Sequence, residues 1–493
     1  MNFFVLLTVL ATAVVSLCAV SWCYFKILKI AKMKNLVDNP DARKLQKEPI
    51  PVTGGIVVFF GVICGSLVGV VLAKVLGVNL ALPMFPIIGS MVAMLYVGAM
   101  DDIVGLSPAS RLVVEVFAVL GLIFASGCCV DNFYGMWGIH SFSWWVAVPL
   151  TVFAGVGIIN AVNMIDGVNG LSSGLCITCS CLYGAFFFWE DDMTNAILAF
   201  AMATALVPFF LHNVFGNKSR MFIGDAGTMM MGILLTWFTI SSIQYEVSFK
   251  MNLIHSRANM IALALSILSV PIFDTIRVMT MRIAQKKSPF HPDKTHLHHV
   301  FVGLGVSHSV TTAIEISINV LIFLIWYVSM KLQVSVDWQF YIVCFFSMVF
   351  VWGAYGLIRW HANHHTLFFH RLTHYSVLKN YSRNSWRQYL ENWLDGLEMK
   401  HDEYVDEPLN ADPVSVVASH GEASNDIKEN DRQLILNFIK GKYEVHVVDI
   451  ISYSGANKLR IYPIILEEVA KGSIRIISST ALGSPDIVAW VND

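Results

Sequence analysis

Residues 54–73 read GGIVVFFGVICGSLVGVVLA, an apolar run without a charged side chain. A helix of roughly 20 such residues is long enough to cross the hydrocarbon core of a bilayer. Similar runs recur through the first 360 of the 493 residues, and the chain is 56% hydrophobic but only 14% charged. Because a soluble protein carries about a quarter charged residues, the sequence predicts an all-α polytopic membrane protein.

Eleven membrane-spanning helices are expected. Their predicted ranges are 3–25, 54–76, 82–100, 111–129, 144–160, 170–189, 195–215, 227–244, 258–283, 311–330 and 340–360. Lysine and arginine collect in the connections after odd-numbered spans. By the positive-inside rule these connections and the C-terminus are cytoplasmic and the N-terminus lies outside. We therefore expect a multi-pass protein of the inner (plasma) membrane, with its first span retained rather than cleaved as a signal peptide.

The composition changes after the transmembrane domain, residues 1–360. Residues 361–400 mix aromatic and basic side chains, which predicts amphipathic helices on the inner leaflet. An acidic linker at 401–430 leads to residues 431–493, where helix-like and strand-like stretches predict a small cytosolic α/β module of unknown role. The nine cysteines lie almost all in or beside apolar runs, so no disulfide framework is expected.

Four polar clusters lie near the predicted span ends, all in odd-numbered connections. Polar side chains at membrane depth are costly, so such clusters are candidate functional sites. The first is the pair Asp101 and Asp102, followed by Arg111. Adjacent carboxylates repel each other unless they point apart or hold a cation, and Mg²⁺ suits their hard oxygens. A solvated helix cap is the alternative.

The second cluster ends the fifth span, where Asn160, Asn163 and Asp166 recur every three residues. Two amides and a carboxylate on one helical face can receive a metal-bound phosphate or the edge of a uracil. Gly167 and Gly170 then permit a tight turn. A plain helix terminus made of polar residues is the alternative.

The third cluster places Asp225 between Gly224 and Gly227, shortly after Phe222. Flanking glycines let the backbone approach a ligand closely. The cluster stands just before the predicted eighth span, and the N-terminal end of a helix favours anions.

The fourth cluster runs from Pro289 to His299 and combines one lysine with a His-Leu-His-His motif. Histidines beside a lysine suit a pyrophosphate; a zinc site and a surface loop without function are the alternatives. In the ninth span, Asp274 and Arg277 lie one helical turn apart. They are expected either to form a buried ion pair that keeps helices in register or to bind substrate.

Together these motifs resemble the polyprenyl-phosphate N-acetylhexosamine-1-phosphate transferases, glycosyltransferase family 4. The resemblance covers about residues 36–305 and includes all four clusters in the family's order, preceded by Asp38, Pro40, Arg43-Lys44, Pro49 and Gly54-Gly55. The His-Leu-His-His motif resembles the branch that uses UDP-N-acetylglucosamine. The branch that transfers phospho-muramoyl-pentapeptide usually has three consecutive histidines followed by Phe-Glu, which are absent here.

The resemblance implies roles for individual residues. Asp225 is expected to bind Mg²⁺ (or Mn²⁺ as a substitute) with Asp102, Phe222 to stack on uracil and Asn169 to contact it. The catalytic candidates are Asp101, Asp102, Arg111, Asn163 and Asp166. The substrate-binding candidates are Lys44, Asn160, Asn169, Phe222, Lys294, His296, His298 and His299. Arg111, Lys294 and Asn169 stand where many members have Lys, Arg and Asp.

The implied reaction moves N-acetylglucosamine 1-phosphate from a UDP-sugar to undecaprenyl phosphate and releases UMP, which starts a lipid-linked glycan such as lipopolysaccharide or a cell-wall polymer. Donors carrying N-acetylgalactosamine, N-acetylfucosamine or N-acetylquinovosamine stay open, and a transporter of an anionic substrate is the remote alternative. The expected partners are the UDP-sugar, the polyprenyl phosphate and the membrane, and no nucleic acid. A homodimer and a protein partner for the C-terminal tail are further alternatives.

Overall fold

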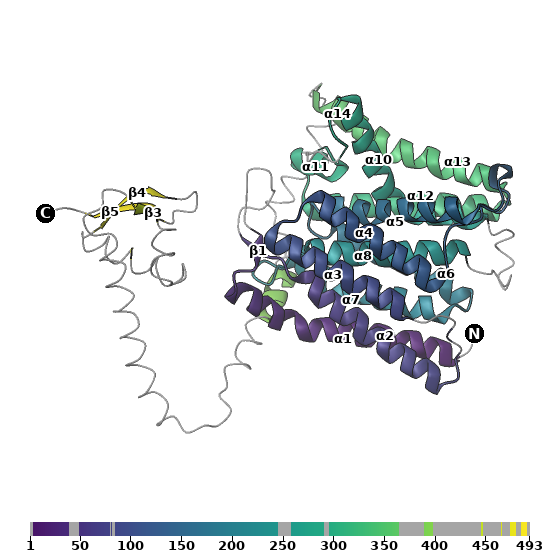
Figure 1. Ribbon diagram of the computed structural model, residues 1–493, viewed down its shortest axis with the longest axis horizontal. Helices are drawn as coiled ribbons and strands as arrows, with labels where there is room; N and C mark the ends of the chain where they lie inside the picture. The colour runs from purple at the N-terminus through teal and green to yellow at the C-terminus, as the bar shows by residue number, and fades with distance from the viewer. Residues whose placement is uncertain are drawn as a thin grey trace. The chain divides into compact units, whose positions relative to one another are not determined.

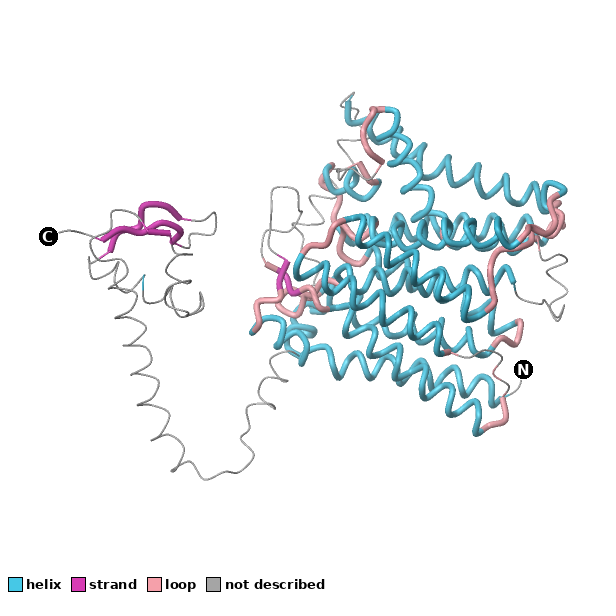
Figure 2. The backbone as a smooth tube through the Cα atoms, viewed as in Figure 1, coloured by secondary structure: helices cyan, strands magenta, loops and turns pink. Residues whose placement is uncertain are grey.

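The computed structural model describes residues 3–38, 49–78, 80, 84–244, 258–289, 295–363, 389–397, 445–446, 465, 474–479 and 485–490. The chain divides into two units, Met1–Glu403 and Tyr404–Asp493. The described part of the first unit is a bundle of long helices with one short strand pair (Figure 1, Figure 2). Lys44 and Lys294 lie outside the described residues.

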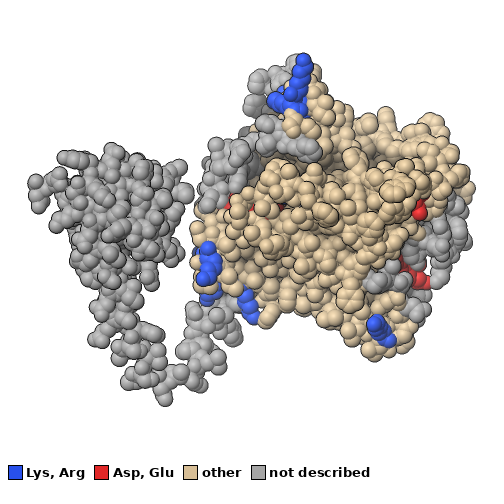
Figure 3. Space-filling view, viewed as in Figure 1, with Lys and Arg blue, Asp and Glu red and all other residues tan. Residues whose placement is uncertain are grey.

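Ten helices in the described residues are long and apolar enough to cross a membrane. They are α1 (Phe3–Met33), α2 (Gly54–Val75), α3 (Phe85–Val104), α4 (Pro108–Ser126), α5 (Trp144–Met164), α6 (Leu171–Trp189), α7 (Met193–Phe215), α8 (Gly224–Gln244), α12 (His308–Lys331), and α13 (Val336–Ser347) continued by η2 (Met348–Gly353) and α14 (Ala354–Asn363). Figure 3 shows a broad uncharged face, with charged side chains near its margins. The chain is a multi-pass membrane protein.

The predicted ninth span, 258–283, is a broken helix rather than a continuous one. It consists of α9 (Asn259–Ile267) and α10 (Ser269–Ala284), bent by 77°. Pro271 has no N–H to donate to the carbonyl of Ile267. Asn319 of α12 supplies the missing partner, because its Nδ2 lies 2.9 Å from Ile267 O and its Oδ1 accepts from Val270 N at 3.1 Å. If this pair is counted as one span, the total is the predicted eleven.

The core surrounds α8, which is buried along almost its whole length. Glycines allow two neighbouring helices to approach its first turn. A Cβ on Gly55 of α2 would lie 2.3 Å from Gly227 N, and one on Gly98 of α3 would lie 2.4 Å from Ala226 N. Since no larger residue fits at either place, Gly55 brings the start of α2, and Gly98 the C-terminal half of α3, against the N-terminal end of α8.

The strand pair β1 (Val37–Asp38) and β2 (Ile50–Pro51) is antiparallel. The segment before α8 continues this arrangement: Phe222 N donates to Pro51 O at 2.7 Å, and Gly54 N donates to Phe222 O at 2.9 Å. Residues 222–223 are therefore fixed beside the start of α2.

The second unit has three described strands, β3 (Val445–His446), β4 (Ile474–Ser479) and β5 (Pro485–Trp490), in the antiparallel order β3-β5-β4. Strands β3 and β4 overlap the strand-like runs predicted at 445–451 and 474–478, whereas β5 overlaps neither. The helix expected before them and the 401–430 linker lie outside the described residues, so the α/β module and the predicted domain boundaries stay predictions. In the 361–400 region, the structure describes residues 361–363 at the end of α14 and a helix at 389–397.

Candidate active site

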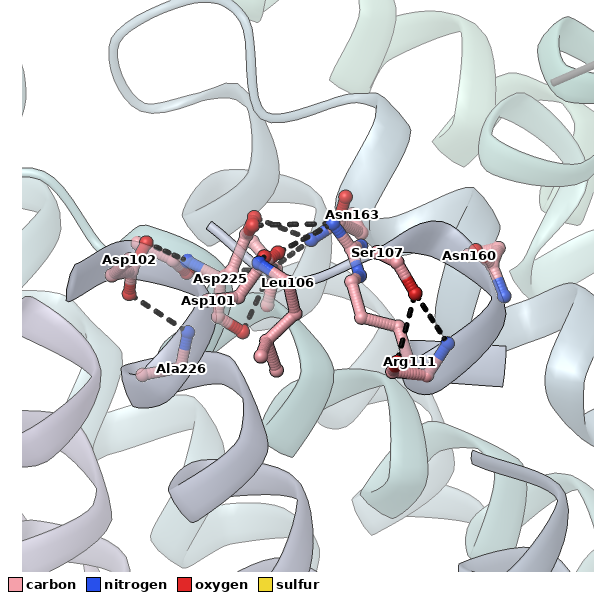
Figure 4. A network of polar contacts seen from close by, with 12 residues as sticks. Asp101, Asp102, Leu106, Ser107, Arg111, Asn160, Asn163, Asp225 and Ala226 are labelled. Atoms are coloured by element: carbon pink, nitrogen blue, oxygen red, sulfur yellow. Dashed lines mark hydrogen bonds and ion pairs between the residues drawn. The ribbon is translucent and has the colours of Figure 1, made fainter. Parts of the chain in front are cut away.

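The carboxylate cluster forms where α3, α4, α5 and α8 meet (Figure 4). Asp101 and Asp102 belong to the last turn of α3 rather than following it, and Arg111 lies in the first turn of α4. The Nη1 of Arg111 is 2.6 Å from Asp101 Oδ2 and 3.3 Å from Asp225 Oδ2. One guanidinium therefore bridges two carboxylates that stand far apart in the sequence.

The two adjacent aspartates point apart. Asp102 accepts hydrogen bonds from Asp225 N at 2.9 Å and from Ala226 N at 3.1 Å, so it caps the N-terminal end of α8. Asp101 turns to Arg111 and also accepts from Leu106 N at 2.6 Å. Gly224 has a φ of 71°, and a Cβ there would lie 2.5 Å from Asp102 Oδ2. Glycine is thus required for this cap on both conformational and steric grounds.

Asn163 fixes the orientation of Asp225 from the side of α5. Its Nδ2 donates to Asp225 Oδ1 at 2.7 Å and to Thr228 Oγ1 at 2.9 Å. Asn160 does not join this cluster, although it lies on the same helix, because its Nδ2 donates to Glu115 Oε2 and to Val156 O. Asp166 lies after the helix and accepts from Ser172 Oγ. The three predicted residues therefore serve three different local contacts.

The residues present suit Mg²⁺. Asp101, Asp225 and Asn163 offer hard oxygen atoms, and the two carboxylates share the guanidinium of Arg111 as a counter-charge. In the described part of the chain, no group of three or more His, Cys, Asp or Glu side chains is arranged to hold a metal. A small protein ligand set fits Mg²⁺, which usually keeps several waters and binds one or two carboxylates together with substrate phosphates.

The histidine motif is held by the Asp274–Arg277 pair. Arg277 Nη2 lies 2.7 Å from Asp274 Oδ1 and donates to Thr295 O at 2.6 Å, while His296 Nδ1 lies 2.8 Å from Asp274 Oδ2. Asp274 also accepts from Leu297 N at 3.2 Å, at the start of α11 (Leu297–Gly303). The ion pair predicted in the ninth span thus exists, and its geometry anchors the motif.

His298 is fully buried, and among the described residues neither of its ring nitrogens has a hydrogen-bond partner. Burial, followed by the neighbouring His299 and His296, lowers the pKa of His298 well below its usual value. A Cβ on Gly167 would lie 2.5 Å from His298 Nε2 and 3.2 Å from His299 Cε1. The α5–α6 turn, which holds Asp166, therefore packs directly on the histidine motif and unites two of the predicted clusters.

Asn213 connects that turn to the segment before α8. Its Oδ1 accepts from Gly170 N at 2.6 Å, and its Nδ2 donates to Met221 O at 2.8 Å. The Asn213 side chain thereby links Gly170, which follows Asn169, to Met221, which precedes Phe222. Neither Asn213 nor Glu115 is among the predicted site residues. Both are polar residues within predicted spans, which is the signal that could have found them, and both are buried in the structure.

These features define a multi-pass membrane protein with a carboxylate-rich site at the ends of its helices. The family model for glycosyl transferase family 4 matches residues 84–243. The undecaprenyl-phosphate alpha-N-acetylglucosaminyl 1-phosphate transferase of Yersinia pestis is 30% identical over 290 residues, 57% of this chain and 73% of that protein. The chain belongs to glycosyl transferase family 4.

Two further relatives have similar names. The Escherichia coli K12 protein, with the same name as the Yersinia protein, is 30% identical over 286 residues, 56% of this chain and 72% of its own length. The probable undecaprenyl-phosphate N-acetylglucosaminyl 1-phosphate transferase of Bacillus subtilis is 28% identical over 289 residues, 58% of this chain and 75% of its own length. The family resemblance predicted from the motifs is confirmed.

Proposed function

We propose that this protein transfers N-acetylglucosamine 1-phosphate from UDP-N-acetylglucosamine to undecaprenyl phosphate at the cytoplasmic face of the plasma membrane. The names of its relatives support this reaction. The observation that carries the proposal is the shared contact of Arg111 with Asp101 and Asp225, beside the capped N-terminal end of α8. A diphosphate needs such a place, where cationic and backbone donors meet oxygen ligands for a metal.

In the proposed reaction, an oxygen of the polyprenyl phosphate attacks the β-phosphorus of the UDP-sugar. A new phosphorus–oxygen bond forms there, the bond from the β-phosphorus to the bridging oxygen breaks, and UMP leaves with that oxygen. A phosphate monoester has a second pKa of about 6 and is largely dianionic near neutral pH, so the acceptor needs no general base. Direct attack in one step is simpler than a two-step reaction through a covalent aspartyl intermediate.

Both reactants are anions, and the protein must offset their repulsion. Arg111 stands with 21% of its side chain exposed, between Asp101 at 7% and Asp225 at 34%, so it can turn part of its charge to a phosphate while staying anchored. Asn163 and the cap from Asp102 hold Asp225 in one orientation. Asp225 and Asp101, rather than Asp102, would hold Mg²⁺, which on binding neutralises the charge of the diphosphate.

The distribution of charge supports the proposed orientation in the membrane. Basic residues collect in the connections on the side of the carboxylate cluster, and the positive-inside rule places those connections in the cytoplasm, with the N-terminus outside. The UDP-sugar and the phosphate head of the lipid then meet at the same surface. A homodimer and a protein partner for the tail stay predictions.

A donor screen tests the proposal. Purified protein in detergent is mixed with undecaprenyl phosphate, Mg²⁺ and one radiolabelled UDP-sugar at a time, and labelled lipid and released UMP are measured. We expect UDP-N-acetylglucosamine to give both products in equal amounts. Preference for another N-acetylhexosamine would change the donor but keep the chemistry. Label that enters proteoliposomes without release of UMP would instead support a transporter and overturn the proposal.

A further inference from the structure

The helix at residues 389–397 contacts the loop between α7 and α8. Asp395 of this helix accepts hydrogen bonds from Asn217 N at 3.2 Å, Lys218 N at 3.2 Å and Ser219 N at 3.1 Å, and from Ser219 Oγ at 2.9 Å. The neighbouring Leu394 is 2% exposed. In Figure 1 this is the short light-green helix near β1 and α1. The contact lies within the first unit of the chain.

Three successive backbone N–H groups directed at one carboxylate form an anion-binding concavity, or nest. Burial raises the pKa of Asp395, but the hydrogen bonds from Ser219, Lys218 and Asn217 outweigh that effect and leave it below its usual value. Asp395 is therefore charged at neutral pH. Hydrogen bonds to a charged acceptor are stronger than those between neutral groups, so this side chain is a firm attachment for the loop.

The opposite side of the loop is bound to the N-terminal helix. Tyr24 OH donates to Ser219 O at 2.8 Å, and Lys32 Nζ donates to Lys218 O at 2.9 Å. His212 Nδ1 is 3.1 Å from Ser219 Oγ. The loop is thus held between α1, α7 and the 389–397 helix, and Asp395 provides the contacts to its N–H groups at 217–219.

The loop leads directly into the site. Phe222 follows Ser219 after two residues, and Gly224 and Asp225 begin α8. Displacement of residues 217–219 would be transmitted along this short segment, because the contacts of Phe222 and Ile223 with residues 51–55 are backbone hydrogen bonds sensitive to register. Asp395 lies outside residues 84–243, which the family model matches, whereas the loop lies inside them.

We propose that Asp395 is a positioning residue for the nucleotide end of the active site. By filling the nest at residues 217–219, it fixes the segment that carries Phe222 and Asp225, and it couples the C-terminal part of the chain to the binding of the UDP-sugar. This inference rests on the proposed function and on the expected contact of Phe222 with the uracil of the nucleotide.

The test compares Asp395→Ala, Asp395→Asn and Asp395→Glu with Asn392→Ala, a control at an exposed position of the same helix. We expect Asp395→Ala to raise KM for the UDP-sugar about tenfold, equivalent to the loss of roughly one charge-assisted hydrogen bond. KM for undecaprenyl phosphate should change less than about twofold. Asp395→Glu should recover part of the loss because it keeps the charge, and Asp395→Asn should not.

Hydrogen–deuterium exchange supplies a readout that does not depend on activity. The amides of residues 217–219 should exchange faster in Asp395→Ala, while peptides from α5 and α12 stay unchanged. If Asp395→Ala does not fold, a Ser219→Ala variant that removes the hydroxyl donor allows the same measurements. Unchanged exchange at 217–219, or an unchanged KM for the UDP-sugar in an active protein, would overturn the inference. If the wild-type protein gives no lipid product with any donor, the proposed function fails, and the exchange data alone judge the contact.

Discussion

Replacement of Arg111 by methionine separates the two roles that its position gives it. The change removes the positive charge between Asp101 and Asp225 but keeps a side chain of similar length. The two contacts are 2.6 and 3.3 Å long. At such separations and an effective dielectric constant of about 20, each unit charge pair is worth roughly 5–6 kcal/mol before the cost of desolvation.

The expected effect on the reaction is smaller than that Coulomb energy. Asp225 is one third exposed, so water screens part of the charge. Removal of one preorganised donor from a developing anion typically costs about 3–4 kcal/mol, or 10²–10³ in rate. We expect Arg111→Met to lower kcat by that factor. Arg111→Lys should lose about tenfold or less, because the charge remains but the fork geometry is lost.

The apparent affinity for Mg²⁺ should rise in the same variant, opposite to the fall in kcat. Arg111 competes with a metal for the oxygens of Asp101 and Asp225, so the half-maximal Mg²⁺ concentration should fall in Arg111→Met while kcat falls. Both quantities come from initial rates of UMP release over a series of Mg²⁺ concentrations. Lys287→Met, at an exposed position outside the cluster, is the control. A kcat within threefold of wild type would refute the assigned role of Arg111.

Three further predictions concern the framework of the site. Asp102→Ala should lower the stability by about 1–2 kcal/mol through loss of the α8 cap; an unchanged thermal midpoint in detergent would contradict this role. Asn319→Leu removes three side-chain hydrogen bonds at the break between α9 and α10, so it should lower the free energy of unfolding by about 2 kcal/mol. Ser317→Ala, at an exposed position of α12, should leave that free energy unchanged. The pKa of His298 is depressed in the folded protein, so as the pH falls the unfolded chain binds a proton at a higher pH than the folded chain does. The free energy of unfolding should therefore fall as the pH drops below 6.5. A His298→Gln variant should show a weaker pH dependence of its thermal midpoint, and identical slopes would count against a buried neutral His298.

The helical architecture could be predicted because it depends on local composition. Apolar runs near 20 residues specify spans wherever they occur, and they located α2 to α8 within a few residues. Helix α1 continues to Met33, past the predicted end at residue 25, because a helix can extend into the basic segment that follows the apolar run. The break after Ile267 was missed because apolar residues continue through it. Pro271 is a visible warning, but a proline can be tolerated in a continuous membrane helix. The bend depends on Asn319, a partner far along the chain.

The residue types of the site could be predicted, but their pairing could not. Asp101, Asp225 and Asn163 meet as the motifs suggest, because glycines at 55 and 98 let the helices approach. Asp102 caps α8 and Asp101 pairs with Arg111 because only the Asp102 carboxylate faces the first turn of α8. Two adjacent aspartates in the sequence do not indicate which of them takes which role. Asn160 lies three residues from Asn163, yet it pairs with Glu115.

Contacts of the C-terminal region were the least predictable. Residues 361–400 were expected to lie on the membrane surface because they mix aromatic and basic side chains. Asp395 is one acidic residue in that stretch, and its partners are backbone N–H groups, which leave no sequence signature. Such a contact is visible only when the loop and the helix are seen together.

The activity of purified Asp225→Asn protein shows directly whether the active site is centred on Asp225. Wild-type and variant are assayed with undecaprenyl phosphate, Mg²⁺ and UDP-N-acetylglucosamine, after matched elution and thermal midpoints show that both are folded. We expect equal release of UMP and formation of labelled lipid by the wild-type protein, and a loss of at least about 10³-fold in the variant. Product formation by Asp225→Asn near the wild-type rate would contradict an active site centred on Asp225.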